Sequence, residues 1–355
     1  MKITLAEHSA EFKKELIGTF ISQEILRMGL EGLFPRETYQ AQLLSIQVQR
    51  NRQLVAVDVQ RCTDPHRNIF SKSTEKLFRP PFYKESIDFC KCDGYEASYG
   101  SGIVPSEGVT RTLASSTIRE MQAIKNKVER AIELQRSQVL QTGIVTLKNG
   151  DSIDYKRRAE SISGVTTPWS DPTADAYGDL VKGMRFLRGK GQSSATSINV
   201  IFGENALTNF MQNDAVKENL EIRRADKINI VMPQFDNVTG MVYHGQASAG
   251  DFIINIWTYN ESYLDPDDNV TEKNYIDPDN VIMVPSDFIG ETSFASTPLV
   301  RYDSDGTPYV TNVKGQYTVY DIIYQVKAAW EIIVQSSPLV VPISIDRIYT
   351  IATGN

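Results

Sequence analysis

The sequence predicts an α+β protein, and three features of the chain lead to this prediction. Residues 42–60 alternate apolar and polar side chains as half-buried strands do. Residues 117–142 hold no glycine or proline and repeat apolar side chains at helical spacing. From Trp169 onward, helical and strand patterns alternate. The 355 residues, 41% hydrophobic and 23% charged, can bury a sizeable core in one large domain or in two or three small ones.

The first 92 residues predict a helix followed by a long β-hairpin. Apolar side chains of residues 12–30 lie near helical spacing, which predicts the helix. Residues 42–60 form the first limb of the hairpin. Its returning limb contains the adjacent prolines Pro80 and Pro81. Because proline removes a donor from the ladder, this limb is expected to be an edge strand or an irregular extended segment. Alternation then resumes, so residues 42–92 together predict one hairpin.

Residues 117–142 predict the longest helix of the chain. Thr117 and Glu120 match a capping box at its start, and Gly143 is suited to its C-terminal end. Such a helix would be about 39 Å long, because each residue adds 1.5 Å.

The rest of the chain predicts short strands and helices in alternation. Two short strands flank the dipeptide Asn149-Gly150, which is typical of hairpin turns. A helix is expected over 171–189, with Asp171 as its cap and Pro172 at its first position. The remaining expected elements are a strand at 197–203, a helix at 204–214, three strands between 229 and 259, a hairpin around the acidic loop 264–280, and a β-rich end at 330–354.

The residue types that bind metals or catalyse reactions form no convincing site. The Cys90-x-Cys92 pair could begin a zinc site, or it could be two strand cysteines on one face. Zinc needs about four ligands, and the further candidates are Cys62, His8, His66 and His244. The loop 264–280 lacks the central glycine and terminal glutamate of a calcium loop. RGKGQSS (188–194) lacks the spacing of a phosphate-binding loop. We therefore expect no metal, no cofactor and no catalytic residues, and we do not expect an enzyme.

Charge and hydropathy restrict the partners of this protein. The formal net charge is −7, whereas tight binding to DNA usually draws on basic residues that neutralise phosphates. An acidic protein can still lie next to DNA without gripping it. No apolar run approaches the roughly 20 residues needed to span a bilayer, so no membrane partner is expected. The N-terminus lacks a signal-peptide core, so the protein is expected to remain in the cytoplasm in which it is made.

The long hairpin indicates assembly with other subunits. Two limbs of about 20 residues would reach about 60–65 Å. An isolated hairpin is only marginally stable in water, so it needs another surface to pack on. A neighbouring subunit is the obvious candidate for that surface.

From about residue 25 to its end, the chain resembles the lambda-type major capsid proteins of tailed bacteriophages, the protein E family. The resemblance is carried by TEKLFRPPFYKESIDF (74–89), WSDPTADAY (169–177), AVKENLEIRR (215–224), KNYIDPDNVIMVP (273–285) and QSSPLVVPISIDRIYTI (335–351). Residues 90–111 and 300–318 depart from the family pattern.

The resemblance implies the Hong Kong 97-type capsid fold. In its layout the parts are an N-terminal arm (1–41), an extended E-loop hairpin (42–92), a peripheral P domain (93–165 and 331–355, with the spine helix 117–142) and an axial A domain (166–330). The E-loop would lie over an adjacent subunit. The expected inter-subunit contact residues are Phe78, Arg79, Pro80, Pro81, Phe82, Tyr83, Arg223 and Arg224. The two arginines could equally form a solvated helix end.

The resemblance also implies a structural function in a virion. The subunits would form hexamers and pentamers of an icosahedral head shell that encloses double-stranded DNA, and would assemble in the host bacterial cytoplasm. Since the sequence begins almost directly at the arm, a separate scaffolding protein is expected. A portal protein and a decoration protein are further implied partners.

Two other classes of function remain open at this point. One is an encapsulin-like compartment shell of the same fold, which co-purifying cargo would favour. The other is a metal- or nucleotide-dependent enzyme built on residues 166–300, which a bound metal or cofactor in the pure protein would favour.

Overall fold

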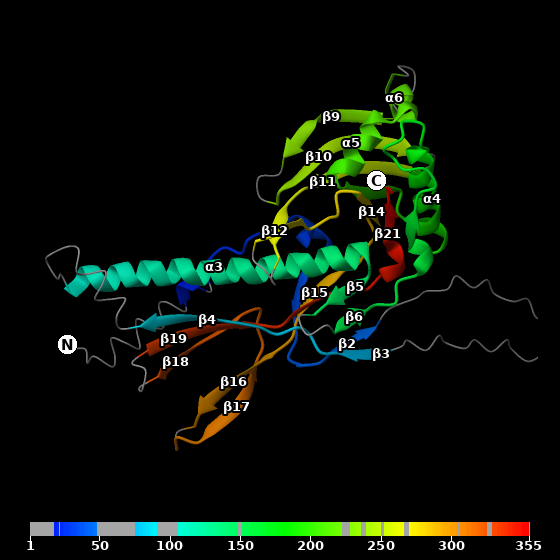
Figure 1. Ribbon diagram of the computed structural model, residues 1–355. Coiled ribbons are helices and arrows are strands. Elements are labelled where there is room, and N and C mark those ends of the chain that lie inside the picture. The colour runs from blue at the N-terminus through cyan, green and yellow to red at the C-terminus, as the bar shows by residue number, and fades with distance from the viewer. Residues whose placement is uncertain are drawn as a thin grey trace, which may run out of the picture.

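The structure is a computed structural model that describes residues 18–20, 22–47, 75–90, 106–147, 151–221, 228–235, 239–249, 252–265, 270–303, 305–324 and 329–354. One long helix, α3 (Ser106–Gln141), runs between a seven-stranded sheet and several smaller sheets. Figure 1 shows the larger sheet above one end of α3 and most of the smaller sheets below it. This arrangement has the mixed helix and strand content that the sequence predicts.

The seven-stranded sheet brings together strands that are distant in sequence. Its order is β7-β21-β14-β8-β11-β10-β9. The bounds are β7 Ile162–Gly164, β8 Ser197–Phe202, β9 Ile228–Phe235, β10 Met241–Ala249, β11 Phe252–Tyr259, β14 Asn280–Pro285 and β21 Tyr349–Ala352. β8 pairs in parallel with β11, and β7 with β21, whereas the other neighbours are antiparallel. The end of the chain therefore contributes a strand to the interior of this sheet.

The two faces of this sheet belong to two hydrophobic cores. In β14, Val281 and Met283 face the core that contains helices α4 (Ala176–Gly189), α5 (Glu204–Gln212) and α6 (Asp214–Glu221). Ile282 and Val284 face the core that contains α3. Because successive side chains of a strand point to opposite faces, a fully apolar strand can serve both cores.

The long helix is longer than the sequence predicts at its start and ends as predicted. It begins at Ser106 rather than at Thr117, and its 36 residues give it a length of about 54 Å. Gly143 follows its end with a φ of 74°, and its N–H donates to the carbonyl of Val139 at 3.0 Å. Arg157 also binds this end, because its Nη1 donates to the carbonyl of Leu140 at 2.8 Å.

The single hairpin predicted over 42–92 is wrong in its last part. β2 (Leu44–Gln47) and β3 (Glu75–Phe78) do pair antiparallel. β4 (Tyr83–Cys90) instead pairs with β19 (Ala329–Ser336) in a three-stranded sheet. The reason lies in Pro80 and Pro81, which cannot donate to a ladder and end β3. Residues 48–74 and 91–105, with Cys62 and Cys92, lie outside the described residues.

Two helix predictions also need correction. Residues 23–28 are not helical, although the N-terminal helix was expected to cover 12–30, and Gly29–Leu33 forms a 3-10 turn. Helix α4 begins at Ala176 with Asp175 as its cap, rather than with Asp171. The side chain of Asp171 instead accepts hydrogen bonds from Thr173 and closes a local turn.

Shorter elements complete the fold. β1 Arg36–Thr38, β15 Glu291–Phe294 and β20 Pro338–Val341 form one sheet, and β18 Thr318–Tyr324 joins β19 and β4. Three pairs of strands form hairpins, namely β5 Ile144–Thr146 with β6 Ser152–Asp154, β12 Ser262–Leu264 with β13 Glu272–Asn274, and β16 Thr297–Tyr302 with β17 Pro308–Val313. The β5–β6 and β12–β13 hairpins confirm the two predicted from sequence. The boundaries of arm, E-loop, P domain and A domain stay predictions.

We predict that Gly183→Ala destabilises the protein although alanine favours helices. A Cβ at Gly183 would lie 2.5 Å from Sδ of Met283 and 2.7 Å from Cδ1 of Tyr349, so α4 would be pushed away from the sheet. Overpacking should outweigh the helix-propensity gain and lower the free energy of unfolding by about 1–2 kcal/mol. Urea denaturation measures the effect. Gly189→Ala is the matched control, because nothing lies within 4 Å of its Cβ, and it should leave stability equal or higher. A Gly183→Ala variant as stable as this control would contradict the prediction.

Candidate functional site

The segment expected to contact another subunit is partly embedded in its own subunit. Phe78 packs against the core, and its ring centroid lies 5.9 Å from that of Tyr155. Pro80 is buried. The hydroxyl of Tyr83 accepts a hydrogen bond from Nε2 of Gln135 at 3.1 Å. Phe78, Pro80 and Tyr83 thus pack within their own chain, and their expected contact with another subunit stays a prediction.

Two residues of this segment do face solvent. Arg79 is exposed, and Phe82 has 47% of its surface exposed. Between them, the carbonyl of Pro81 accepts a hydrogen bond from Oγ of Ser337 at 3.1 Å, which holds the segment in place. The inter-subunit contact stays a prediction for the whole segment from Phe78 to Tyr83, and Arg79 and Phe82 are its exposed members. Arg223 and Arg224 lie outside the described residues.

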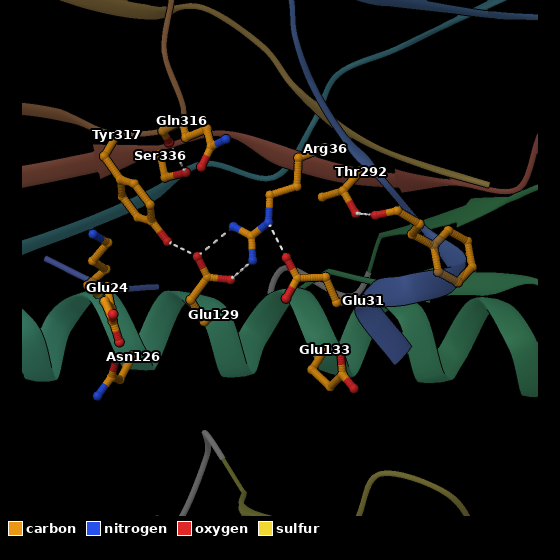
Figure 2. Close-up of polar contacts among 12 residues, drawn as sticks. Glu24, Glu31, Arg36, Asn126, Glu129, Glu133, Thr292, Gln316, Tyr317 and Ser336 are labelled. Carbon is orange, nitrogen blue, oxygen red and sulfur yellow. Dashed lines mark hydrogen bonds and ion pairs between the residues drawn. The ribbon is translucent and has the colours of Figure 1, made fainter. Parts of the chain in front are cut away.

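The most unusual feature of the interior is a cluster of charges on α3, shown in Figure 2. Glu129 is fully buried, and both of its oxygens accept hydrogen bonds at 2.8 Å from the guanidinium of Arg36. Arg36 also donates from Nε to Glu31 at 2.7 Å. The hydroxyl of Tyr317 donates to the same carboxylate of Glu129. The bidentate contact between Arg36 and Glu129 is a strong and directional form of ion pair.

A second buried pair lies one turn further along α3. Oε2 of Glu133 lies 3.0 Å from Nη1 of Arg136, and both side chains are 0% exposed. The other oxygen of Glu133 accepts from the backbone N–H of Leu30 at 2.8 Å. Arg136 donates to Oγ1 of Thr292 at 3.2 Å, and Thr292 in turn donates to the carbonyl of Phe34. Glu133 therefore binds residues 29–38 directly through Leu30, and Arg136 binds them through Thr292.

Lys125 fixes an earlier part of the N-terminal segment. Its ammonium donates to the backbone carbonyl of Gln23 at 2.6 Å and lies 5.3 Å from the ring centroid of Phe20. The ring of Tyr317 lies on the same ammonium at 5.8 Å. Three successive turns of α3 thus bind residues 20–36 through polar groups as well as apolar packing.

Burial and neighbouring charges both shift the pKa values of this cluster. Burial alone would lower the pKa of Arg36, but the carboxylates of Glu129 and Glu31 outweigh it and raise the pKa. Burial lowers the pKa of Lys125, which Glu129 partly offsets. Burial raises the pKa of Glu133 against the opposing charge of Arg136. Burial and Glu129 both raise the pKa of Tyr317. Arg36 and Tyr317 thus remain protonated donors to Glu129.

This cluster is suited to holding chain segments together rather than to chemistry. Each carboxylate of the two pairs is engaged by arginine and by a further donor. In the part of the chain that the structure describes, no group of three or more His, Cys, Asp or Glu is placed to hold a metal ion. His244, one of the suggested ligands, forms a 2.9 Å hydrogen bond with Oγ1 of Thr258. None of the helices within the described ranges has the length and hydrophobicity needed to cross a bilayer.

Sequence reasoning missed this cluster, although a signal was present. Glu129, Glu133 and Arg136 are spaced at i, i+4 and i+7, so they share one face of the helix. This face lies next to the apolar stripe that contains Val128 and Ile132. A charged stripe at this spacing usually lies in solvent, and only the packing of residues 29–38 onto it shows that it is buried.

Comparison with known proteins defines the class. The fold is of the Hong Kong 97 type, that of phage capsid proteins. The chain belongs to the phage major capsid protein E family, whose model matches residues 27–353.

Several solved structures are similar to the chain. A prophage protein from E. coli CFT073, described as a capsid protein, has a TM-score of 0.58 at 16% identity, with 96% of this chain and 98% of that chain covered. A phage-related protein from Bordetella bronchiseptica RB50 has a TM-score of 0.49 at 10% identity, covering 96% of both chains. The holo-SrpI encapsulin complex of Synechococcus elongatus PCC 7942 has a TM-score of 0.42 at 10% identity, covering 91% and 86%. No curated protein matches the chain.

We predict that Glu129→Gln lowers the free energy of unfolding by about 3–5 kcal/mol, because it leaves the buried guanidinium of Arg36 without an opposite charge on α3. Replacing both partners, as Arg36→Met with Glu129→Leu, should recover part of this loss, since apolar side chains then replace the buried pair; recovery should be incomplete because Glu31 also loses its arginine partner. Urea denaturation of the three proteins measures both effects.

The matched control is a more exposed ion pair between the same helix and β4. Nζ of Lys127 lies 2.8 Å from Oε1 of Glu85, and the two side chains are 65% and 35% exposed. Glu85→Gln should cost at most about 1 kcal/mol, because water screens exposed pairs. Equal losses for Glu85→Gln and Glu129→Gln would refute a special contribution of the buried pair.

Proposed function

We propose that this protein is the major capsid subunit of a tailed bacteriophage. Its copies assemble into hexamers and pentamers of an icosahedral shell that encloses double-stranded DNA. The observation that carries this proposal is membership of the capsid family over residues 27–353. The net charge of −7 supports a shell that contains DNA without binding it tightly. The protein resides in the virion after assembly in the host bacterial cytoplasm.

The proposed shell needs other proteins as well. A separate scaffolding protein directs assembly, a portal protein occupies one vertex, and a decoration protein binds the finished shell. Repeated contacts between different patches of identical subunits are what closes a ring, so each subunit must present at least two complementary surfaces. The exposed Arg79 and Phe82 belong to one such surface in this proposal.

We predict that the purified protein, expressed with a scaffolding protein, forms closed shells or capsomer rings. Negative-stain electron microscopy and analytical ultracentrifugation measure particle shape and mass. A protein that stays monomeric at high concentration with scaffold present would overturn the proposed function. Shells that co-purify with a defined protein cargo would instead identify a compartment shell of the same fold.

We also predict that residues 48–74 serve assembly rather than folding. Gln47 and Glu75 are direct partners in the β2–β3 ladder, so an Asn-Gly turn can replace residues 48–74 and close the same hairpin. The shortened protein should keep the thermal unfolding midpoint of the wild type, because Phe78 and the rest of the core are retained. Its particle yield should fall by about tenfold or more, since each subunit loses a contact with its neighbour.

The control for this deletion is the same turn inserted without removing any residue, between Asn149 and Gly150, where the sequence predicts a hairpin turn. That variant should both fold and assemble. If the deletion variant makes shells of wild-type yield and heat resistance, the proposed role of residues 48–74 is wrong.

A further inference from the structure

The hairpin of β16 and β17 is a sheet of only two strands. In Figure 1 it projects from the lower side of the molecule, away from α3 and from the seven-stranded sheet. Its base is fixed, because Oγ1 of Thr297 and Oγ1 of Thr318 lie 2.6 Å apart and Gln42 donates to Oδ1 of Asn312 at 2.7 Å. An isolated two-stranded hairpin is marginally stable in water, so the projecting part is expected to pack on another surface.

One face of this hairpin is apolar and exposed. Val300 and Val310 are direct cross-strand partners and therefore lie on the same face. Their exposed fractions are 56% and 67%. Pro298 and Pro308 lie on this face at alternate positions and are also exposed. The tip beyond this face is acidic, with Asp303 and Asp305 both exposed.

The same chain carries a surface of complementary character. Arg79 and Phe82 are exposed, and they lie on the extended segment between β3 and β4. Phe82 lies three positions after Arg79, a span of roughly 10 Å in extended chain. Asp303 likewise lies three positions after Val300, again roughly 10 Å. Val300 can thus contact the ring of Phe82 while Asp303 lies near Arg79.

We propose that the outward face of the β16–β17 hairpin packs on the Arg79–Phe82 segment of a second copy of this chain. Val300 and Val310 cover the ring of Phe82, and the acidic tip lies against Arg79. The partner is another copy because this chain itself supplies both the matching charge and the matching apolar group. This inference rests on the proposed self-assembly and assigns one contact within it.

Mixed particles test the contact directly. In a background with Cys62, Cys90 and Cys92 changed to serine, one protein carries Val310→Cys and the other carries Phe82→Cys. Particles assembled from an equal mixture are treated with a short bifunctional maleimide. A covalent dimer on a denaturing gel is expected from the mixture and not from either protein alone. The control replaces Val310→Cys by Val270→Cys, which alters an exposed side chain on the β12–β13 hairpin and should give no dimer.

Charge and apolar substitutions give an independent measurement. Val300→Asp with Val310→Asp should lower particle yield by about tenfold while circular dichroism of the subunit is unchanged, because the hairpin lies outside the core. Val270→Asp should assemble normally. Asp303→Arg with Asp305→Arg should also reduce the yield, and adding Arg79→Asp should restore most of it.

The outcomes separate the two proposals. Wild-type protein that forms no particles overturns the proposed function. The hairpin contact is overturned, and the proposed function kept, by a different result. In that result wild-type and Val270→Asp proteins form particles, the Val300→Asp/Val310→Asp variant forms them in equal yield, and no cross-link appears.

Discussion

The structure depends on one constraint, that α3 buries charges as well as apolar side chains. Glu129 is fully buried, and both oxygens of its carboxylate accept hydrogen bonds from the guanidinium of Arg36. The energy of such a pair depends on both partners staying in place, since a single unpaired charge in the interior is strongly unfavourable. Arg36 is therefore fixed on α3, and with it the chain that leads into β1. β1 pairs with β15, and β15 pairs with β20, so fixing Arg36 on α3 also helps to fix this three-stranded sheet relative to the helix.

The seven-stranded sheet joins α3 and α4 through apolar packing on its two faces. Its strand β14 is apolar on both faces, so one face belongs to the core that contains α3 and the other to the core that contains α4. At the end of α3, Arg157 donates to the carbonyls of Leu140 and Gln141 and to Oγ1 of Thr350 in β21. Burial lowers the pKa of Arg157 to about 9, so it still carries its charge at neutral pH. The helix and the last strand of the chain are thereby fixed to one another.

The distribution of residues between interior and surface fits a subunit of a larger assembly. Charges that usually lie in solvent are buried on α3, whereas apolar side chains such as Phe82, Val300 and Val310 are exposed. Phe82 lies on the extended segment between β3 and β4, and Val300 and Val310 lie on the β16–β17 hairpin. In the proposed shell, neighbouring copies would cover these side chains.

The sequence by itself determined the class of fold, α3 from Thr117 to its glycine end, the buried strand β8 and the β5–β6 hairpin. Each of these follows from a local pattern of apolar residues and turn residues. Several segments that resemble the protein E family, in the same order along the chain, also identified the capsid family. Only the tertiary structure decided that β4 pairs with β19, that Phe78 and Tyr83 face their own core, and that Glu129 and Arg36 are buried together. Local periodicity shows which face of an element is apolar. It cannot show which distant segment covers a polar face, because that depends on contacts such as the one between Arg36 and Glu129, 93 positions apart in the chain.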